Sequence, residues 1–261
     1  MSKFIIEENL WEIMQPLLPK KKATGRPRFD DYKIMNGIFY LLRTGCQWGA
    51  LPNCFGKKST IYGRFIKLVN LGFFEKLRRT ITRNYFADSN ICKIWYSIDA
   101  SFSKSPRGGI LTGKNPTDRR KSGIKKTIII DRKGAPIGFS IGAANKHDSQ
   151  FVKKAFDSLN EFLPKDLKII TADSAYDSLE LKTFFLKNNF VPMISENIRN
   201  SKNKHILRKH PLHRWIVERT HAWLNYYRAI FIRWTRRYDT FEALFAFACS
   251  CRVFQMTGVF G

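Results

Sequence analysis

The sequence predicts a mixed α/β protein in which a small all-helical part, residues 1–90, precedes a strand-rich domain, residues 91–261. Three observations support this fold class. Apolar residues in the first part recur at helical spacing, whereas apolar strand-like runs alternate with helix-like segments from about residue 92 onward. With 44% apolar and 14% aromatic residues, the 261-residue chain can bury a substantial core and is not expected to be disordered.

Four helices are expected in residues 1–90. The first places its apolar side chains at helical spacing and ends before Pro16; these side chains are Ile5, Ile6, Leu10, Ile13 and Met14. After the basic linker PLLPKKKATGRPRFD, Asp30 or Asp31 caps a second helix, YKIMNGIFYLLRTG, which Gly45 ends. The segment STIYGRFIKLVNLG, with Ser59 as a candidate cap, and the segment FFEKLRRTITRNYF give the third and fourth helices.

A short helix, a turn and a basic amphipathic helix together resemble a helix-turn-helix unit. In that interpretation four cations are available to DNA phosphates, namely Lys57, Lys58, Arg64 and Lys67. A plain helical bundle with a solvated basic face has the same spacing, so both interpretations stay open.

Five strands are expected in residues 91–261, the first three being KIWYSID, TIIIDRKG and APIGFSIGAAN. The RKG turn indicates that the second and third pair antiparallel. The helix SQFVKKAFDSLNEFL, the strand LKIITAD, the helix SLELKTFFLKNN and the strand FVPMIS follow. A long helix at about 212–234 and a final helix, FEALFAFACSCRVF, end the chain. This order matches an RNase H-like fold, a mixed five-stranded sheet with flanking helices.

The charge of the chain indicates a polyanionic partner. Its 46 Lys and Arg against 21 Asp and Glu give a formal net charge of +25 and an isoelectric point near 10.1. A solvated basic surface or an anionic membrane would also suit this balance. Trp, Tyr and Phe are interleaved with the cations along the chain, which favours nucleic acid.

Cysteine usage and hydropathy favour a soluble cytoplasmic protein. The five cysteines are an odd number at scattered positions, which indicates a reducing compartment, and no His/Cys pairs of metal-binding spacing accompany them. The N-terminal MSKFIIEENLWEIMQ is interrupted by charge and is unlike a signal peptide. No uninterrupted apolar run approaches the 18 residues of a membrane span.

Three acidic residues stand where a metal site would need them. Asp99 and Asp173 each follow an apolar strand and precede small residues, while Glu218 is the only acid between Glu196 and Asp239. Two carboxylates at strand ends and a third on a helix can bind two divalent metals that cut or join phosphodiesters. Each acid alone would be an ordinary turn residue, cap or surface ion pair. Their order and separations (173 − 99 = 74 and 218 − 173 = 45) favour the metal site.

On a helical wheel, the face around Glu218 also carries Arg214, His221, Asn225 and Arg228. An apolar stripe occupies the other side and would pack against the protein. The acid is therefore expected among hydrogen-bond donors and cations. A surface pair between Arg214 and Glu218 is the simpler alternative.

Several blocks of the chain resemble a known family. SIDASFSKSPRGG and TGKNPTDRRKSG resemble the first catalytic block of bacterial insertion-sequence transposases of the DDE class. AANKHDS, TADSAYDS and WIVERTHAWLNYYR resemble the later blocks, and TGCQWGALPNCFGKKSTIYGRF resembles the helical domain of the insertion-sequence-five group. The resemblance covers nearly the whole chain. It implies an RNase H-like core, a metal-binding triad of Asp99, Asp173 and Glu218, two Mg²⁺ or Mn²⁺ ions, and a homodimer on DNA.

The chain departs from this family around the Glu. Related transposases carry a Tyr, an Arg and a Lys at fixed offsets, and Arg214 matches the Arg. The Tyr position is Pro211 and the Lys position is Asn225, so Arg228, one turn further on, is the candidate for gripping phosphate. This departure leaves open how a cleaved end is held and whether a hairpin forms.

Further DNA contacts are expected from the loop SKSPRGGILTGKNPTDRRKSGIKK, which has eight Lys or Arg against one Asp. A mobile solvated loop is the alternative. In the DNA-binding interpretation, the candidate cations of this loop are Arg107, Lys114, Arg119, Arg120 and Lys121. The helix around Glu218 adds Arg214, His221 and Arg228. His147 and Asp148 either form a turn and a helix cap or support the acids, and the cap is slightly favoured.

The predicted function is therefore that of a transposase that binds the terminal inverted repeats of its element and catalyses metal-dependent strand cleavage and transfer. Its partner would be double-stranded DNA, both element ends and target, with no membrane and no small-molecule substrate. The alternatives are a transposase-derived DNA-binding regulator that does not cut, and another nuclease with the RNase H fold.

Overall fold

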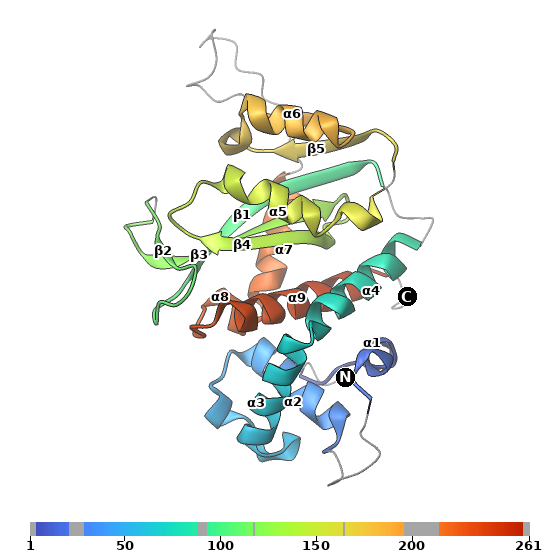
Figure 1. The fold of residues 1–261 in the computed structure, drawn as a ribbon, viewed down its shortest axis with the longest axis vertical. Helices are drawn as coiled ribbons and strands as arrows, with labels where there is room; N and C mark the ends of the chain where they lie inside the picture. Colours follow the sequence, from blue (N-terminus) through green and yellow to red (C-terminus); the bar gives the residue numbers. More distant parts are fainter. Residues whose placement is uncertain are drawn as a thin grey trace.

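The computed structural model describes residues 4–20, 29–87, 93–116, 118–163, 165–195 and 214–257, with only the backbone of Asn160 and Arg214 (Figure 1). Residues 21–28 of the expected linker, the boundary near residue 90 and the basic connection after residue 195 lie outside these residues. The helices are α1 (Glu8–Met14), α2 (Asp31–Thr44), α3 (Lys58–Asn70), α4 (Phe73–Ala87), α5 (Val152–Asp157), α6 (Leu179–Lys187), α7 (Arg214–Asn225), α8 (Arg228–Phe231) and α9 (Tyr238–Phe254). The strands are β1 (Trp95–Lys104), β2 (Gly113–Lys114), β3 (Ser122–Asp131), β4 (Pro136–Ala143), β5 (Lys168–Ala172) and β6 (Phe190–Ile194).

The N-terminal helices begin and end where their capping residues predict, with one exception. The Asp30 carboxylate accepts a hydrogen bond from the Tyr32 amide at 2.8 Å and caps α2. Gly45, with a φ of 67°, ends the same helix in the left-handed conformation. The prediction that Ser59 caps α3 is wrong, because the helix begins at Lys58 and Lys57 occupies the cap position without a side-chain hydrogen bond.

The sheet is mixed, and its strands follow one another along the chain in the order predicted for an RNase H-like fold. β4, β3 and β1 are antiparallel neighbours, and β1, β5 and β6 continue the sheet in parallel. The predicted hairpin joins β3 to β4, where the Asp131 carboxylate accepts from the Gly134 and Ala135 amides. The structure adds the short strand β2, which pairs with the beginning of β3. In Figure 1, α5 crosses the front of the sheet and α7 passes behind it.

Two strand boundaries differ from the prediction. β1 continues to Lys104, so Asp99 lies within the strand and not at its end. It lies just beyond the last residue pair that β1 shares with β5, which is Ser97 with Thr171. The basic loop is correspondingly shorter, because its ends belong to β1 and β3. The predicted helix at 149–163 is also shortened, since α5 is flanked by 3₁₀ turns.

The prediction of a single long helix at about residues 212–234 is wrong. α7 ends at Asn225, and α8 is a separate four-residue helix. The chain leaves the helical path because Ile232 pairs with Lys104 as a parallel bridge, and the Arg233 amide donates to the Lys104 carbonyl at 2.8 Å. The helical wheel drawn from Glu218 therefore ends at Asn225, and Arg228 lies in another element.

α4 and α9 join the two parts of the molecule. They cross between the sheet and the N-terminal helices (Figure 1). The tilted rings of Phe74 on α4 and Phe247 on α9 have centroids 5.6 Å apart, and the rings of Phe139 on β4 and Phe245 on α9 meet edge to face at 5.1 Å. The buried apolar residues form one continuous cluster from α1 to α9. Among the described residues, no helix is both long and apolar enough to span a bilayer.

Candidate active site

Asp99 on β1 and Asp173, the residue after the end of β5, both lie two residues beyond the last pair that these neighbouring parallel strands share. The pairing of β1 with β5 runs from Trp95–Ile169 to Ser97–Thr171, an offset of 74 residues (169 − 95), and the two acids are separated by the same offset (173 − 99). Two residues before them, the Ser97 and Thr171 hydroxyls meet at 2.6 Å. Because side chains alternate along a strand, both acids continue on the face that these hydroxyls share.

A small hollow separates these acids from α7. Its lining includes Asp99, Asp173 and Val217, and its volume of about 20 Å³ suits one water molecule or one ion. Asp99 is half-buried, with 26% of its side chain exposed. The Asp173 carboxylate accepts from the Ala175 amide at 2.8 Å through Oδ1 and so begins a short 3₁₀ turn.

Glu218 is the residue after Val217 and lies exposed on α7. Within the described part of the chain, no three His, Cys, Asp or Glu side chains gather closely enough to hold one metal ion. The structure thus brings Asp99 and Asp173 together and places Glu218 on the adjacent helix. Carboxylate oxygens are the donors that Mg²⁺ and Mn²⁺ prefer, so the chemistry of this donor set fits such an ion.

His221 lies against Asp99 and does not face solvent. Its side chain is 8% exposed, and its Nε2 is 3.6 Å from Asp99 Oδ2 without a hydrogen-bond partner among the described residues. Burial, together with the nearby Lys126 charge, lowers the pKa of His221 to about 3, and a hydrogen bond with the Asp99 backbone opposes this shift. The ring is therefore neutral near pH 7. The predicted direct contact of His221 with a phosphate does not fit this buried position, because position 221 turns toward β1.

Tyr176 is a site residue that the sequence analysis missed. Its hydroxyl is buried and has no hydrogen-bond partner among the described residues. Burial raises the pKa of Tyr176 well above its ordinary value, and the charges of Asp99, Asp148 and Asp173 add to the effect. An unsatisfied buried hydroxyl is costly, so a water molecule or a ligand between these carboxylates would supply its partner. Only its position three residues after Asp173 could have drawn attention to it.

Lys126 is a second residue that the sequence did not single out. Its ammonium group is buried beside α7 and donates to Asn225 Oδ1 and to the Ile230 carbonyl, both at 3.3 Å. It also lies 5.9 Å from the ring centroid of Phe245. These bonds fix the end of α7 and the helix α8 against β3. The position of α7, and with it that of Glu218, therefore depends on a buried charge.

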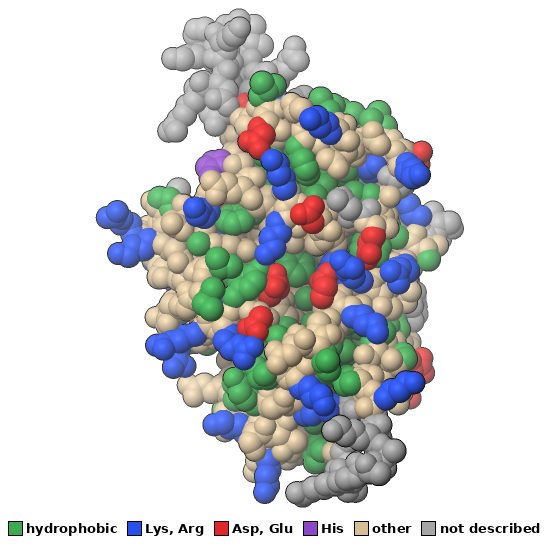
Figure 2. Space-filling view, in the orientation of Figure 1, with side chains coloured by type: hydrophobic (Ala, Val, Ile, Leu, Met, Phe, Trp, Pro, Cys, Tyr) green, Lys and Arg blue, Asp and Glu red, His purple; other side chains and the backbone are tan. Residues whose placement is uncertain are grey.

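The predicted DNA-contacting cations divide into several groups. The ones with exposed side chains are Lys57, Lys58, Lys67, Arg107, Lys114, Arg119, Arg120 and Arg228. Arg64 is largely buried and pairs with Asp31 at 2.7 Å, and Lys121 pairs with Asp118 at 2.7 Å. The side chain of Arg214 is not among those that the structure describes. Figure 2 shows Lys and Arg side chains gathered along the left edge of the molecule, where β2 and the beginning of β3 lie.

His147 and Asp148 have the local roles that a turn and a cap require. His147 precedes a 3₁₀ turn and accepts from the Ser149 amide at 3.4 Å. Asp148 pairs with Lys125 at 2.9 Å while its charge reaches Tyr176. Asp148 is thus both a turn residue and a neighbour of the acids.

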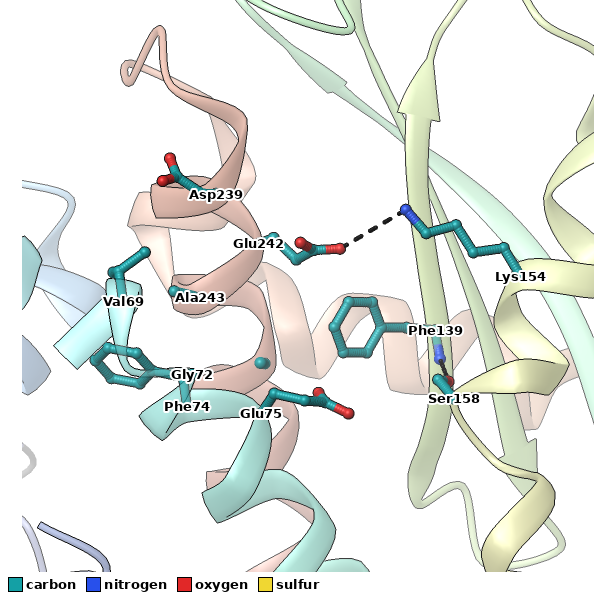
Figure 3. A pocket seen from close by; sticks show the side chains of 11 residues that line it. Val69, Gly72, Phe74, Glu75, Phe139, Lys154, Ser158, Asp239, Glu242 and Ala243 are labelled. Carbon is teal, nitrogen blue, oxygen red and sulfur yellow. Dashed lines mark hydrogen bonds and ion pairs between the residues drawn. The ribbon is translucent and has the colours of Figure 1, made fainter.

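A larger hollow of about 270 Å³ lies away from these acids, where α4 and α9 meet β4 (Figure 3). Its acidic side chains already have partners. Glu75 pairs with Arg78, and Glu242 accepts from the Tyr238 hydroxyl at 2.6 Å and faces Lys154 at 3.9 Å. We interpret this hollow as part of the joint between the two parts of the molecule and not as a reaction site.

Comparison with known proteins identifies the family. Residues 92–253, more than half of the chain, match the family model described as "Transposase DDE domain". The chain belongs to the DDE transposase family. Residues 6–78 match a second model, described as "Putative transposase of IS4/5 family".

Two relatives from Burkholderia cepacia are similar to this DDE transposase family member. The "Putative transposase for insertion sequence element IS402" is 31% identical over 144 residues, which cover 53% of this chain and 66% of the relative, just under two thirds of its length. The "Insertion element IS402 uncharacterized 16.2 kDa protein" is 28% identical over 123 residues, covering 44% of this chain and 84% of that protein.

Among solved structures, a piggyBac transposase synaptic complex with hairpin DNA aligns with 97% of this chain and 73% of its own chain, at 11% identity and a TM-score of 0.47. A Mos1 transposase paired-end complex aligns with 92% of this chain and 82% of its own chain, at 9% identity and a TM-score of 0.30.

Proposed function

We propose that this transposase binds the ends of an insertion sequence and catalyses DNA strand cleavage and strand transfer, with Asp99, Asp173 and Glu218 holding divalent metal ions. The observation that carries this proposal is the shared register of Asp99 and Asp173 beside α7, the helix that bears Glu218. The family assignment supports the reaction class.

Different residues of the candidate active site would have different roles in the reaction. Bound Mg²⁺ or Mn²⁺ would supply Lewis acidity and neutralise developing charge on the phosphate. Asp99 and Asp173 would hold the ions from one side, and Glu218 would complete the set from α7. The neutral ring of His221 packs against Asp99 and restricts its movement. The Tyr176 hydroxyl would donate to an oxygen in the occupied site.

The arrangement of the chain supports finer assignments within this proposal. Residues 1–90 would recognise the element's end, and residues 91–261 would carry the chemistry. Exposed cations of α3 and of the loops near β2 would neutralise phosphates on the duplex. Two copies of the chain would hold two element ends. The relatives are bacterial, and we expect this protein to act in the bacterial cytoplasm, on the nucleoid.

The test is a Mg²⁺-dependent nicking assay on a duplex that carries the element's end, run beside a gel-shift titration. We expect Asp99→Ala, Asp173→Ala and Glu218→Ala each to lower cleavage by roughly 10²- to 10³-fold or more, because no neighbour replaces the lost metal ligand. DNA binding should be unchanged or slightly tighter, since each change removes negative charge from the path of the phosphates. Asp157→Ala is the matched control, because Asp157 is an exposed acid at the end of α5.

The outcomes separate the alternatives. If Glu218→Ala cleaves DNA at the wild-type rate, Glu218 does not hold a metal ion and is only a surface ion-pair partner. A wild-type protein that binds the element's end without cutting it would be a regulator that has lost the reaction. Cleavage of any branched or nicked duplex without preference for the element's end would indicate another nuclease with this fold.

A further inference from the structure

Two segments at the far end of β1 are tied together. One is the loop of residues 105–112, and the other is the segment of residues 232–237 that follows α8. The Arg233 amide donates to the Lys104 carbonyl at 2.8 Å, and the Ile110 amide donates to the Arg236 carbonyl at 3.2 Å. The loop is therefore anchored to a segment more than one hundred residues away in the chain.

The side chain of Arg233 fixes this arrangement from inside. It is fully buried, and its guanidinium donates to the carbonyls of Ile110 at 2.8 Å, Thr235 at 2.9 Å and Arg236 at 2.9 Å. Gly109 adopts a φ of 121°, and a Cβ at this position would lie 2.5 Å from the Arg236 carbonyl oxygen. The two backbones thus approach so closely that only glycine fits, and the loop is held in one conformation.

This fixed loop exposes apolar side chains instead of burying them. Ile110 is 65% exposed, and Trp234 on the neighbouring segment is 51% exposed. Leu111, next to Ile110, is also exposed and has a φ of 59°, a strained backbone for a leucine. Presenting large apolar groups on a rigid loop carries a cost in water, which a partner that covers them would offset.

The surroundings of these apolar groups are cationic. The exposed side chains of Lys104, Arg107, Arg228 and Arg236 come from the two segments and their ends. No Asp or Glu occurs in residues 100–117 or 219–238, and the acids just beyond these ranges, Asp118 and Asp239, pair with Lys121 and Arg237. A basic rim around an apolar tip suits a DNA duplex, because cations can bind the phosphates while an apolar wedge enters between base pairs.

The distance along β1 relates this surface to the candidate active site. Lys104 is five residues beyond Asp99 (104 − 99), which is roughly 17 Å of strand. That length corresponds to about five base-pair steps of a duplex. A duplex with its reacting phosphate at Asp99 and its axis along β1 would therefore pass the 105–112 loop about five base pairs away.

We propose that the 105–112 loop inserts Ile110 between base pairs of the bound duplex, with Trp234 beside it, and bends the DNA about five base pairs from the reacting phosphate. This inference rests on the proposed function, because DNA must occupy the candidate active site. The bend brings more of the duplex onto the basic rim, and the unstacking of one base step is its energetic cost.

The experiment measures binding and bending separately with the full chain. A duplex carrying the element's end bears a donor and an acceptor dye at its two ends for energy transfer. A series of such duplexes carries 2-aminopurine at successive positions three to seven base pairs from the cleavage point. We expect the wild-type protein to shorten the dye distance and to raise 2-aminopurine fluorescence near the fifth position.

Ile110→Ser is the decisive variant, and Leu179→Ser is its control, because Leu179 on α6 is 82% exposed at another part of the surface. We expect Ile110→Ser to lose both signals and to bind the paired duplex about tenfold more weakly. A mismatch at the fifth position should restore most of that affinity, since the base step is then already unstacked. Leu179→Ser should match the wild type throughout.

Binding without bending, or equal bending by Ile110→Ser, overturns the wedge and leaves the proposed function standing. Failure of the wild-type protein to bind any duplex overturns both. The wild-type protein is also tested for binding to vesicles of phosphatidylserine and phosphatidylcholine. If Ile110→Ser abolishes vesicle binding but leaves DNA bending unchanged, the surface binds a membrane, and the proposal is overturned.

Discussion

At the residue scale, Lys126 shows how one buried charge near the site links stability to pH. Among the described residues, the acceptors of this ammonium group are an amide oxygen and a carbonyl oxygen, both at 3.3 Å, and burial lowers its pKa from 10.5 to about 8. Keeping this group charged at neutral pH therefore destabilises the fold. In return, its bonds to Asn225 and to Ile230 hold the end of α7.

We predict that Lys126→Met removes a rise in stability at alkaline pH. Below pH 8 the folded and unfolded chains both hold the proton. Between about pH 8 and 10.5 only the unfolded chain holds it, so the unfolding free energy of the wild type rises with pH, by an upper limit of about 3 kcal/mol. Urea unfolding at several pH values gives the difference between the two proteins. Lys76→Met, an exposed change on α4, is the control, and parallel curves for wild type and Lys126→Met would contradict the prediction.

At the element scale, the position of α4 depends on a buried arginine. Arg78 is fully buried and donates to the Ile137 carbonyl of β4 and to the Ser158 carbonyl after α5, both at 2.8 Å. It also pairs with Glu75 on its own helix at 2.6 Å. The helix is thus bound to the sheet by directional bonds in addition to apolar packing, which fixes its orientation.

We predict that Arg78→Met lowers the unfolding free energy by roughly 3 kcal/mol or more, because two buried carbonyls and Glu75 lose their donor. Arg79→Met is a matched control on the same helix. Arg79 contacts the same Glu75 at 3.2 Å but is 48% exposed, so its loss should cost less than about 1 kcal/mol. Urea unfolding of both variants measures the difference, and equal effects would show that Arg78 does not anchor α4.

At the scale of the whole molecule, the two parts defined by sequence share one core. The helices α4 and α9 bury their apolar faces against each other and against β4, and the cluster of buried residues continues from one part to the other. A division of labour between recognition and chemistry is compatible with this core. Independent folding of the two parts is not expected.

We therefore predict that the full chain unfolds as one unit. Hydrogen exchange followed by mass spectrometry at increasing urea should show α2 and β3 losing protection together, because the apolar face of α4 has no cover once α9 leaves. The single transition should also appear by circular dichroism. Loss of protection in α2 well before β3 would indicate two independent folding units.

We also predict a steep salt dependence of DNA binding, because a net charge of +25 must act through phosphate neutralisation. Affinity for the element's end should fall by about 10³-fold or more between about 50 mM and 200 mM salt. In a plot of the logarithm of the binding constant against the logarithm of the salt concentration, Lys57→Ala should make the slope shallower by about one. Lys153→Ala, an exposed lysine that already pairs with Glu180 at 2.7 Å, should leave it unchanged. A flat dependence would exclude the basic surface as the DNA footprint.

The sequence by itself determined the order of the strands and the ends of the capped helices. Alternating apolar runs, the RKG turn, Asp30 and Gly45 are local signals, and each acts within a few residues. The separation of Asp99 from Asp173 was also readable, and it equals the register of β1 with β5. The three acids could thus be nominated before any fold was known.

Only the tertiary structure decided which polar groups are buried and where the last helices break. His221 and Glu218 share a helical wheel, yet β1 covers the first and leaves the second exposed. Ile232 leaves the helical path because it finds a strand partner in Lys104, 128 positions earlier (232 − 104). The same kind of long-range contact holds three buried or largely buried cations, namely Arg64, Lys126 and Arg233. Burial and pairing depend on residues that are distant in the chain, and no local pattern contains that information.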